Sequence, residues 1–580
     1  MKSTKRTASM ILAAMLAVST FAGCGSSSDT GESNGSSTPA ASGGSSAEGG
    51  SEAGSGITGA ELVQHGVTDP KYGSGEFLKY DEPVTVTFGC LFDAQSDSLL
   101  AMADAGEPLE DNRWIKYFRD EMNIECKYEF CIGSTTDYNQ KILLLSASGG
   151  LPDVFLVSDL SQLNQLAEAE AIADLTQVYA DNASTTLLDT MEYEGSNIYS
   201  MALVNGSMYA VPCKMPSTNG YNHCWVRQDW LDEQGLERPQ TMDDVKNIAQ
   251  VFKDNYDNNI GLMLNKDYLS ESKGIFWAFG GKTAVRKYWQ TMEDGTAAFS
   301  EVQPEMKGGL AWLRDMYESG LVNQEFATQD ITTAFEYVAN NQCGIFYAPH
   351  WYGFRMQTAE GSLSEGANWV ACGLPTGIEG QTTKVYATNT ADGVYCVNAD
   401  FEHPEALVQM LNAYTEKLFG ENNDFTNFFA CDLNSGVWNA SPIHALHPLV
   451  DLTPHNELAE AYRNGTMDQL TGTAADYRDY IDNGLSAYKY MFGPVDSCFN
   501  FVEETYPDIV EWNAYAGAPT ETWVNKWSTL QELIDTTFLK IIQGELEVDK
   551  GFDDMVEQWY SLGGEDITKE VNEIVASYSK

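Results

Sequence analysis

The chain has 580 residues, with 33 basic and 84 acidic side chains that give a formal net charge of −51 at pH 7. A surface this acidic repels nucleic acid and anionic lipid head groups, so neither is an expected partner. The length is too great for one simple core and is sufficient for two large lobes.

The first residues predict export. Lys2, Lys5 and Arg6 form a basic start, and residues 11–18 are an apolar run that is too short to span a bilayer. This is the pattern of a signal peptide, so we expect residues 1–23 to be removed.

The residues at the end of this signal predict a lipid anchor. Residues 21–24, Phe-Ala-Gly-Cys, resemble a bacterial lipobox, whose cysteine, here Cys24, becomes the lipidated new N-terminus. The alternative is an ordinary signal peptide with an incidental cysteine. Residues 24–60 are mostly Gly, Ser, Ala, Thr and Glu, which predicts a flexible tether. We therefore expect the protein on the extracellular face of the cytoplasmic membrane, attached through its lipid only.

The elements of an α/β lobe follow the tether. Residues 84–88 and 124–130 alternate as strands, and residues 114–122 between them have a helical pattern. A helical run over residues 142–148 then ends at two glycines, and the apolar run 154–157 is typical of a parallel strand buried on both faces. This order of elements predicts a mostly parallel sheet with right-handed crossovers.

Two polar residues, Ser158 and Asp159, directly follow the last of these strands. Open α/β sheets bind ligands at the carboxyl ends of their parallel strands. We therefore expect Ser158 and Asp159 to face a ligand, and the Asp159 carboxylate to accept charge-assisted hydrogen bonds from hydroxyl groups.

A series of motifs in a fixed order resembles the extracellular solute-binding proteins of bacterial carbohydrate ABC importers, in particular their large lipoprotein branch. The motifs occupy residues 147–154 (ASGGLPDV), 206–212 (GSMYAVP), 225–231 (WVRQDWL), 235–244, 310–326, 393–414, 516–520, 539–545 and 551–564. Within them, Thr241 followed by Asp244 also predicts the N-cap of a helix. The resemblance covers nearly all of the chain after the tether.

The resemblance implies a two-lobed, periplasmic-binding-protein-like α/β fold, with a mostly parallel sheet flanked by helices in each lobe and a ligand cleft between them. It places residues 81–208 and 391–425 in lobe one, and residues 212–388 and 430–580 in lobe two. The chain would cross between the lobes at 209–212 and at 387–393, where bending allows the lobes to close.

Aromatic residues after two strands of lobe two are expected to stack on sugar rings in this cleft. Trp351 and Tyr352 follow an apolar strand at residues 344–347. Tyr268 and Trp277 come after an earlier strand. The alternative for Trp351 is packing between helices, because large aromatic side chains are mostly buried.

Neither a metal nor a cofactor is predicted. Relatives in the lipoprotein branch often carry a calcium loop where this chain has residues 253–261, but here the loop lacks the turning glycine and the closing glutamate. His444, His447 and His455 with Asp451 lie among apolar residues and prolines, which indicates an ordinary loop.

Besides Cys24 the chain has ten cysteines, and none belongs to a C-x-x-C pair. Several lie in apolar runs, so buried thiols are expected, with one or two disulfides left open.

Two classes of function follow. In the first, a monomeric, non-catalytic lipoprotein captures a saccharide by lobe closure and delivers it to the permease subunits of an ABC importer. The alternative is a membrane-tethered secreted carbohydrate-active enzyme, which needs two carboxylates about 5–10 Å apart across the sugar. The ordered motifs favour the binding protein.

Overall fold

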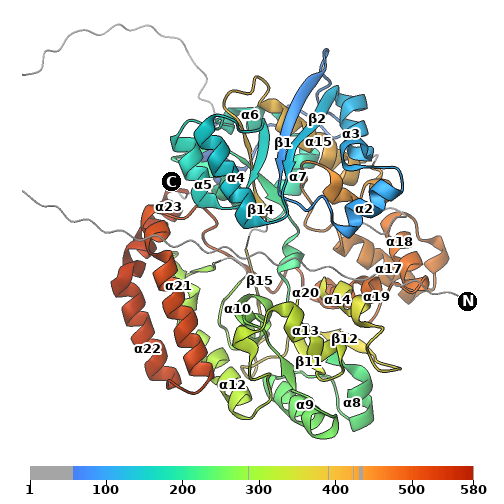
Figure 1. Ribbon diagram of the computed structural model, residues 1–580, viewed down its shortest axis with the longest axis vertical. Helices are drawn as coiled ribbons and strands as arrows, with labels where there is room; N and C mark the ends of the chain where they lie inside the picture. The colour runs from blue at the N-terminus through green and yellow to red at the C-terminus, as the bar shows by residue number, and fades with distance from the viewer. Residues whose placement is uncertain (1–56, 285–286, 389–390, 422, 430–435, 579–580) are drawn as a thin grey trace, which may run out of the picture. The chain divides into compact units, whose positions relative to one another are not determined.

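The computed structural model describes residues 57–578 apart from 285–286, 389–390, 422 and 430–435 (Figure 1). The predicted signal peptide, Cys24 and most of the tether lie outside the described residues. The described chain has two large sheets, each with its own helices and core, so the predicted two-lobed α/β fold is confirmed. None of the described helices is long and apolar enough to cross a membrane.

The first lobe contains a five-stranded mixed sheet. Its strands, in spatial order, are β2 (Ile124–Cys131), β1 (Val84–Cys90), β3 (Val154–Val157), β14 (Ala391–Val397) and β6 (Val211–Lys214). Strand β1 is parallel to β2 and β3, as the order of elements predicts, whereas β14 is antiparallel to both of its neighbours. The antiparallel pairs arise because β6 leads out of this lobe and β14 leads back into it.

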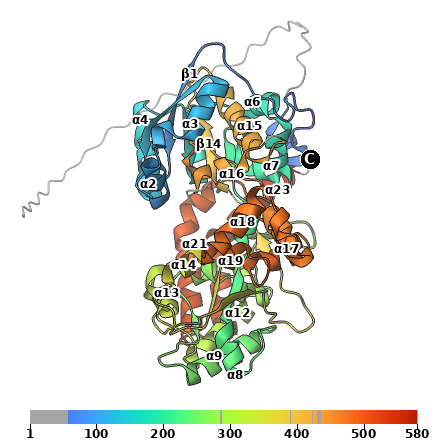
Figure 2. The same ribbon diagram turned by 90° about the vertical axis from the view of Figure 1, so that its right-hand side faces the viewer.

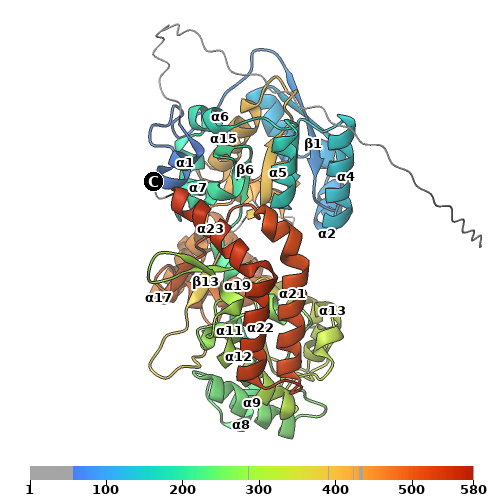
Figure 3. The ribbon, with the colours of Figure 1, turned by 90° about the vertical axis from the view of Figure 1, so that its left-hand side faces the viewer.

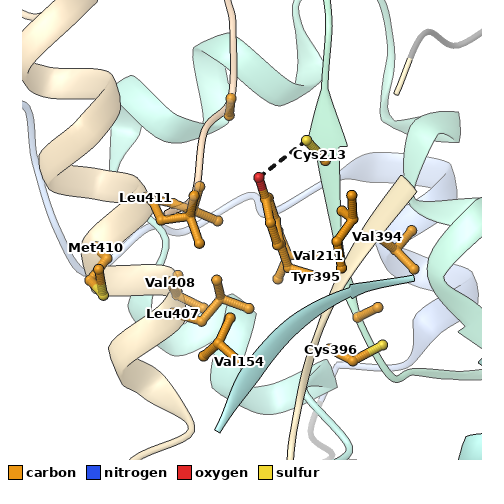
Figure 4. Close-up of a cluster of buried hydrophobic side chains, with 14 of the residues drawn as sticks. Val154, Val211, Cys213, Val394, Tyr395, Cys396, Leu407, Val408, Met410 and Leu411 are labelled. Atoms are coloured by element: carbon orange, nitrogen blue, oxygen red, sulfur yellow. Dashed lines mark hydrogen bonds between the residues drawn. The ribbon is translucent and has the colours of Figure 1, made fainter. Parts of the chain in front are cut away.

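The helices of the first lobe pack around this sheet. Their bounds are α1 (Gly59–His65), α2 (Asp97–Asp104), α3 (Arg113–Tyr117), α4 (Thr135–Ser148), α5 (Leu160–Glu168), α6 (Thr176–Asn182), α7 (Thr185–Glu192), α15 (Glu405–Phe419) and α16 (Phe425–Phe428). Figure 4 shows Leu407, Val408 and Leu411 of α15 near Val154 of β3 and Tyr395 of β14. All five side chains are buried, so a helix made after the sheet of the second lobe completes the core of the first.

The second lobe contains a four-stranded mixed sheet that is buried on both faces. Its strands, in spatial order, are β12 (Trp369–Cys372), β7 (His223–Arg227), β11 (Ile345–Ala348) and β8 (Leu262–Met263). Strand β7 is antiparallel to both of its neighbours and only β11 and β8 are parallel, so the predicted mostly parallel sheet is wrong for this lobe. Successive residues of a strand point to opposite faces. In β11, Ile345 and Tyr347 belong to one core cluster and Phe346 belongs to another. Because both faces of β11 are buried, its sequence is a continuous run of apolar residues.

The helices of the second lobe cover this sheet in two groups. Their bounds are α8 (Gln228–Gln234), α9 (Met242–Asn255), α10 (Tyr268–Glu271), α11 (Gly274–Ala278), α12 (Met306–Glu318), α13 (Ile331–Ala339), α14 (Tyr352–Ala359), α17 (Leu452–Asn464), α18 (Gly472–Asp482), α19 (Ser486–Phe492), α20 (Cys498–Thr505), α21 (Glu521–Ile542), α22 (Val548–Trp559) and α23 (Glu565–Tyr578). Helices α17–α19 lie near α14 (Figure 2), and α21 and α22 lie along α12 (Figure 3). Helix α9 begins with the predicted capping box of Thr241 and Asp244.

The first crossing lies later in the chain than predicted. Val211 and Pro212 pair with Tyr395 and Val394 in the first sheet, and β6 continues to Lys214. The predicted hinge at residues 209–212 is therefore wrong, because its backbone is held in a sheet ladder. The chain leaves the first sheet after Lys214.

The return crossing falls inside the predicted segment 387–393. Strand β13 (Val385–Ala387) pairs with β15 (Val510–Trp512) in the second lobe, and β14 of the first sheet begins at Ala391.

A third connection is also later than predicted, because the first lobe extends beyond residue 425. Val437, Ala440, Ile443 and Leu446 are buried in the first core. The boundary predicted between residues 425 and 430 is therefore wrong, and the chain returns to the second lobe ahead of α17.

A buried ion pair stands at the first crossing. The Lys214 Nζ lies 2.8 Å from the Glu194 Oε2, and the two side chains are 0% and 2% exposed. The hydroxyl groups of Ser217 and Tyr506 both donate to the other carboxylate oxygen, Tyr506 at 2.8 Å. Because Glu194 follows α7 of the first lobe and Tyr506 follows α20 of the second, this carboxylate joins both lobes.

We expect Lys214→Met to lower the free energy of unfolding by about 3–5 kcal/mol, because it leaves the buried Glu194 carboxylate without its cation. Urea unfolding measures the loss. Lys71→Met is the matched control: Lys71 pairs with Asp181 at 2.5 Å, but the two side chains are 61% and 36% exposed. Its loss should stay below about 1 kcal/mol. Equal losses in the two variants would contradict the role of burial.

Candidate functional site

The connection from β6 to β7 joins the two large sheets, and the return connection leads from β13 to β14 of the first sheet. At the end of β6, Lys214 lies opposite Ala391 at the start of β14, and β14 is antiparallel to β3. At the start of β7, His223 lies opposite Ala348 at the end of β11. The carboxyl ends of β3 and β11 are therefore next to the segments that link the lobes. This is where ligands of open α/β sheets bind, so both edges are candidates for one site.

The edge of the first lobe contains a cavity of about 670 Å³. Its lining includes Asn139, Ser158, Asp159, Trp438, Asn439 and His444. The structure thus places the predicted pair Ser158 and Asp159 together at a cavity, and adds residues from the segment after α16 that the sequence did not reveal. No periodic pattern marks that segment, which was assigned to the other lobe.

Asp159 caps helix α5 and keeps one oxygen for other partners. Its Oδ1 accepts hydrogen bonds from the backbone N–H of Ser161 at 3.0 Å and from the Ser161 hydroxyl at 2.7 Å. Among the described residues, nothing donates to its Oδ2, and the side chain is exposed. The Ser158 hydroxyl donates to the Oδ1 of Asn139 at 3.1 Å. This edge can therefore accept hydrogen bonds from ligand hydroxyl groups.

His444 and Trp438 form the aromatic wall of the cavity. Their rings meet edge to face with centroids 5.1 Å apart. The Nε2 of His444 lies 3.1 Å from the Cys213 sulfur, and its Nδ1 lies 3.4 Å from the Tyr395 hydroxyl. Burial lowers the pKa of His444 to about 4, so the ring is neutral at pH 7.

Near the carboxyl end of β11, the described part of the second lobe contains buried polar groups without hydrogen-bond partners. Among the described residues, both ring nitrogens of His223 lack a hydrogen-bond partner, as do the Nδ1 of His350 and the Thr218 hydroxyl. A buried polar atom without a partner costs about 1–3 kcal/mol. The end of β11 therefore has hydrogen-bonding groups that the described chain leaves unused.

Trp351 and Tyr352, predicted to stack on sugars, differ in their surroundings. Trp351 is 39% exposed at the start of α14, so its ring is accessible. Tyr352 is buried: its hydroxyl donates to the Glu271 Oε2 at 2.7 Å, and its ring packs on Phe335. Stacking by Tyr352 is wrong for this structure, because the core covers the ring.

Tyr268 and Trp277 are also buried in the cores of the second lobe. The Tyr268 ring packs against Phe326 with centroids 5.6 Å apart. Trp277 is only 1% exposed, and its indole N–H donates to the carbonyl of Thr283 at 2.7 Å. Their prediction as stacking residues is therefore wrong in this structure, and the physical reason is ordinary core packing.

The described residues contain no cluster of three His, Cys, Asp or Glu side chains that could hold a metal ion. Asp451 accepts a hydrogen bond from the Tyr477 hydroxyl at 2.8 Å, whereas His455 lies 3.1 Å from the carbonyl of Phe492. No disulfide joins the nine cysteines that the structure describes.

The buried histidines at the second edge should make the protein sensitive to acid. Burial, helped by the nearby His350 and Lys273, lowers the pKa of His223 to about 3. Burial likewise lowers the pKa of His350 to about 3. Between pH 6.5 and 3 these rings take up protons only in the unfolded chain. The free energy of unfolding therefore falls as the pH falls through this window.

We expect His223→Phe to reduce this sensitivity. Replacing one such histidine should make the loss of unfolding free energy between pH 7.5 and pH 5 about 2 kcal/mol smaller than in the native protein. Urea unfolding at the two pH values measures the difference. The same loss in both proteins would contradict the neutral, buried state of His223.

Comparison with known proteins identifies a family for most of this architecture. Residues 100–417, more than half of the chain, match the family described as "Bacterial extracellular solute-binding protein". Among curated relatives, lipoprotein LipO of Bacillus subtilis is 22% identical over 467 residues, which cover 76% of this chain and 85% of LipO.

Two solved structures share the fold. The alginate-binding protein AlgQ2 has a TM-score of 0.57 at 13% identity, over 87% of this chain and 99% of the other. The S. pneumoniae ABC-transporter substrate-binding protein FusA, an EF-hand mutant in complex with fructo-nystose, also has a TM-score of 0.57, at 16% identity over 85% of this chain and 99% of the other.

Proposed function

Because this chain belongs to the bacterial extracellular solute-binding proteins, we propose that it captures an oligosaccharide between its lobes and delivers it to the permease subunits of an ABC importer. The main support for the proposal is that the carboxyl ends of β3 and β11 both lie beside the segments that link the lobes. Polar groups that can bind a ligand lie at each of these ends. AlgQ2 is an alginate-binding protein and FusA was solved in complex with fructo-nystose, which supports a saccharide as the ligand.

Family membership also decides between the two predicted classes of function. The family consists of solute-binding proteins, so the prediction of a binding protein and not an enzyme is confirmed.

The proposed site combines one accessible ring from each lobe with the polar groups between them. Trp438 lies in the wall of the first-lobe cavity, and Trp351 is exposed on the second lobe. Flat aromatic faces suit the apolar faces of pyranose rings, and Ser158 and Asp159 suit their hydroxyl groups. Closure of the lobes as a monomer would bring these groups onto one ligand.

The first test compares two tryptophans of the second lobe. Trp351→Ala should weaken saccharide binding by about 2 kcal/mol without lowering the melting temperature, because the ring is accessible. Trp277→Ala is the matched control, and it should cost about 3–5 kcal/mol of stability because this ring is 1% exposed. A thermal-shift screen of neutral and acidic oligosaccharides first finds a ligand, and calorimetry then measures affinity.

Unchanged affinity in Trp351→Ala would remove this residue from the site. Turnover of any screened saccharide into new products would favour the enzyme.

We also propose that the protein is anchored to the outer face of the cytoplasmic membrane by a lipid on Cys24. The lipobox-like residues before Cys24 and the small-residue tether after it support this anchor, and a relative is named a lipoprotein. Cys24→Ala should move the protein from the membrane fraction into the medium, measured by immunoblotting of both fractions. Cys431→Ala is the control and should leave the distribution unchanged. A membrane fraction that is the same in Cys24→Ala would contradict the anchor.

A further inference from the structure

The edge of the second lobe contains a buried cation without an anion. Lys273 precedes α11 and is only 1% exposed, and burial lowers its pKa to about 8. In the part of the chain that the structure describes, its ammonium makes no ion pair and donates no hydrogen bond to an acceptor. The ammonium lies over the face of the Trp277 ring, 5.6 Å from its centroid. An ammonium taken out of water without a partner is costly, which is unusual in a folded core.

The nearest carboxylate is already engaged. Glu271 lies two residues before Lys273, close enough to favour the charged lysine, but its Oε2 accepts the Tyr352 hydroxyl at 2.7 Å. It lies beyond ion-pair distance of the ammonium. Glu271 therefore supports the charge on Lys273 from a distance and leaves the amine hydrogens without an acceptor.

Two neutral imidazoles lie next to this lysine. Gly274, the residue after Lys273, donates its backbone N–H to the Oδ1 of Asn222 at 3.0 Å, and His223 follows Asn222. His223 in turn lies opposite Ala348 in the sheet, two residues before His350. Within the described ranges, His223 has no partner at either ring nitrogen, and the Nδ1 of His350 has none. A neutral imidazole offers one N–H donor and one acceptor nitrogen. The end of β11 therefore has an ammonium and N–H donors with no anionic acceptor paired to them.

From this surplus of donors we infer that the captured saccharide carries a carboxylate, and that Lys273 is its partner, with His223 and His350 donating further hydrogen bonds. The inference rests on the proposed function and names the substrate class as uronic-acid-containing oligosaccharides. A ligand carboxylate supplies the missing anion, and a charge-assisted pair in a desolvated site is strong.

The first-lobe edge sets the orientation of such a ligand. Asp159 and Asp392 line its cavity, and their charges repel a carboxylate. The uronate group therefore lies against Lys273, while hydroxyl groups of the remaining sugars face Ser158 and Asp159. With a net charge of −51, the chain as a whole disfavours anions, so the selection depends on this local cation.

The experiment compares each ligand with its own neutral form. Short oligogalacturonates, oligoguluronates and glucuronic-acid-containing xylan fragments are each tested beside the same oligosaccharide with its carboxyl groups reduced to alcohols. Titration calorimetry with the native chain should show that at least one acidic form binds about tenfold to one hundredfold more tightly than its reduced form. Equal or tighter binding of every reduced form would overturn the inference. This comparison needs no variant, so it holds even if a substitution at Lys273 prevents folding.

Lys273→Met then tests the residue. It should bring the affinity of the acidic form down to that of the reduced form, while the reduced form binds as before. Lys266→Met removes the same charge from an exposed position in the same lobe, 51% exposed, and should keep the preference for the acidic form. A preference that survives in Lys273→Met would overturn the assignment to this lysine.

Three further outcomes separate this inference from the proposed function. Binding of neutral oligosaccharides without binding of any uronate would overturn the inference and leave saccharide capture intact. A sulfated neutral oligosaccharide that binds as tightly as the best uronate would overturn the choice of a carboxylate. Failure of every saccharide to bind would overturn the proposed function itself.

Discussion

The buried ion pair of Lys214 and Glu194 fixes the place where the chain passes from one lobe to the other. Each buried charge costs several kcal/mol of desolvation, which is repaid only in a geometry that also satisfies the remaining oxygens. The hydroxyls of Ser217 and Tyr506 complete that geometry. Because Tyr506 belongs to the second lobe, any rotation of the lobes about this crossing has to keep its bond to Glu194 or replace it.

This constraint explains why the candidate site lies where it does. The strands next to the crossings present their ends to the linking segments, and the polar groups of both lobes follow those ends. A rotation about the crossings would therefore move the two edges relative to each other while each sheet stays rigid. Under the proposed function, a bound ligand would recover the cost of burying the unpaired groups of His223 and Lys273.

Sequence reasoning succeeded where a structural feature depends on neighbours in the chain. The strands of the first lobe, the cap at Thr241 and the position of Asp159 after β3 all follow from local periodicity and turn chemistry. It failed where the feature depends on distant partners. The pairing of Val211 with Tyr395 requires a strand made much later.

The same limit applies to the aromatic side chains. Trp351 and Trp277 follow strands in similar ways, but only the tertiary packing of α11 decides that Trp277 is covered. Trp438 and His444 were not found because their segment has no regular period, and its place in the first lobe comes from core contacts alone. Of the residues in the proposed site, Ser158, Asp159 and Trp351 were predictable from the sequence, and Lys273 was not.

The position of β14 has a consequence for how the protein is made. This strand lies in the interior of the first sheet, between β3 and β6, yet the sheet of the second lobe precedes it in the chain. Until β14 has emerged, β3 and β6 expose unpaired edges, which are templates for wrong association. The sheet of the first lobe therefore cannot be completed before β14 has been made. Its completion waits for a long-range contact, which makes maturation slow compared with that of a protein whose strands pair in order.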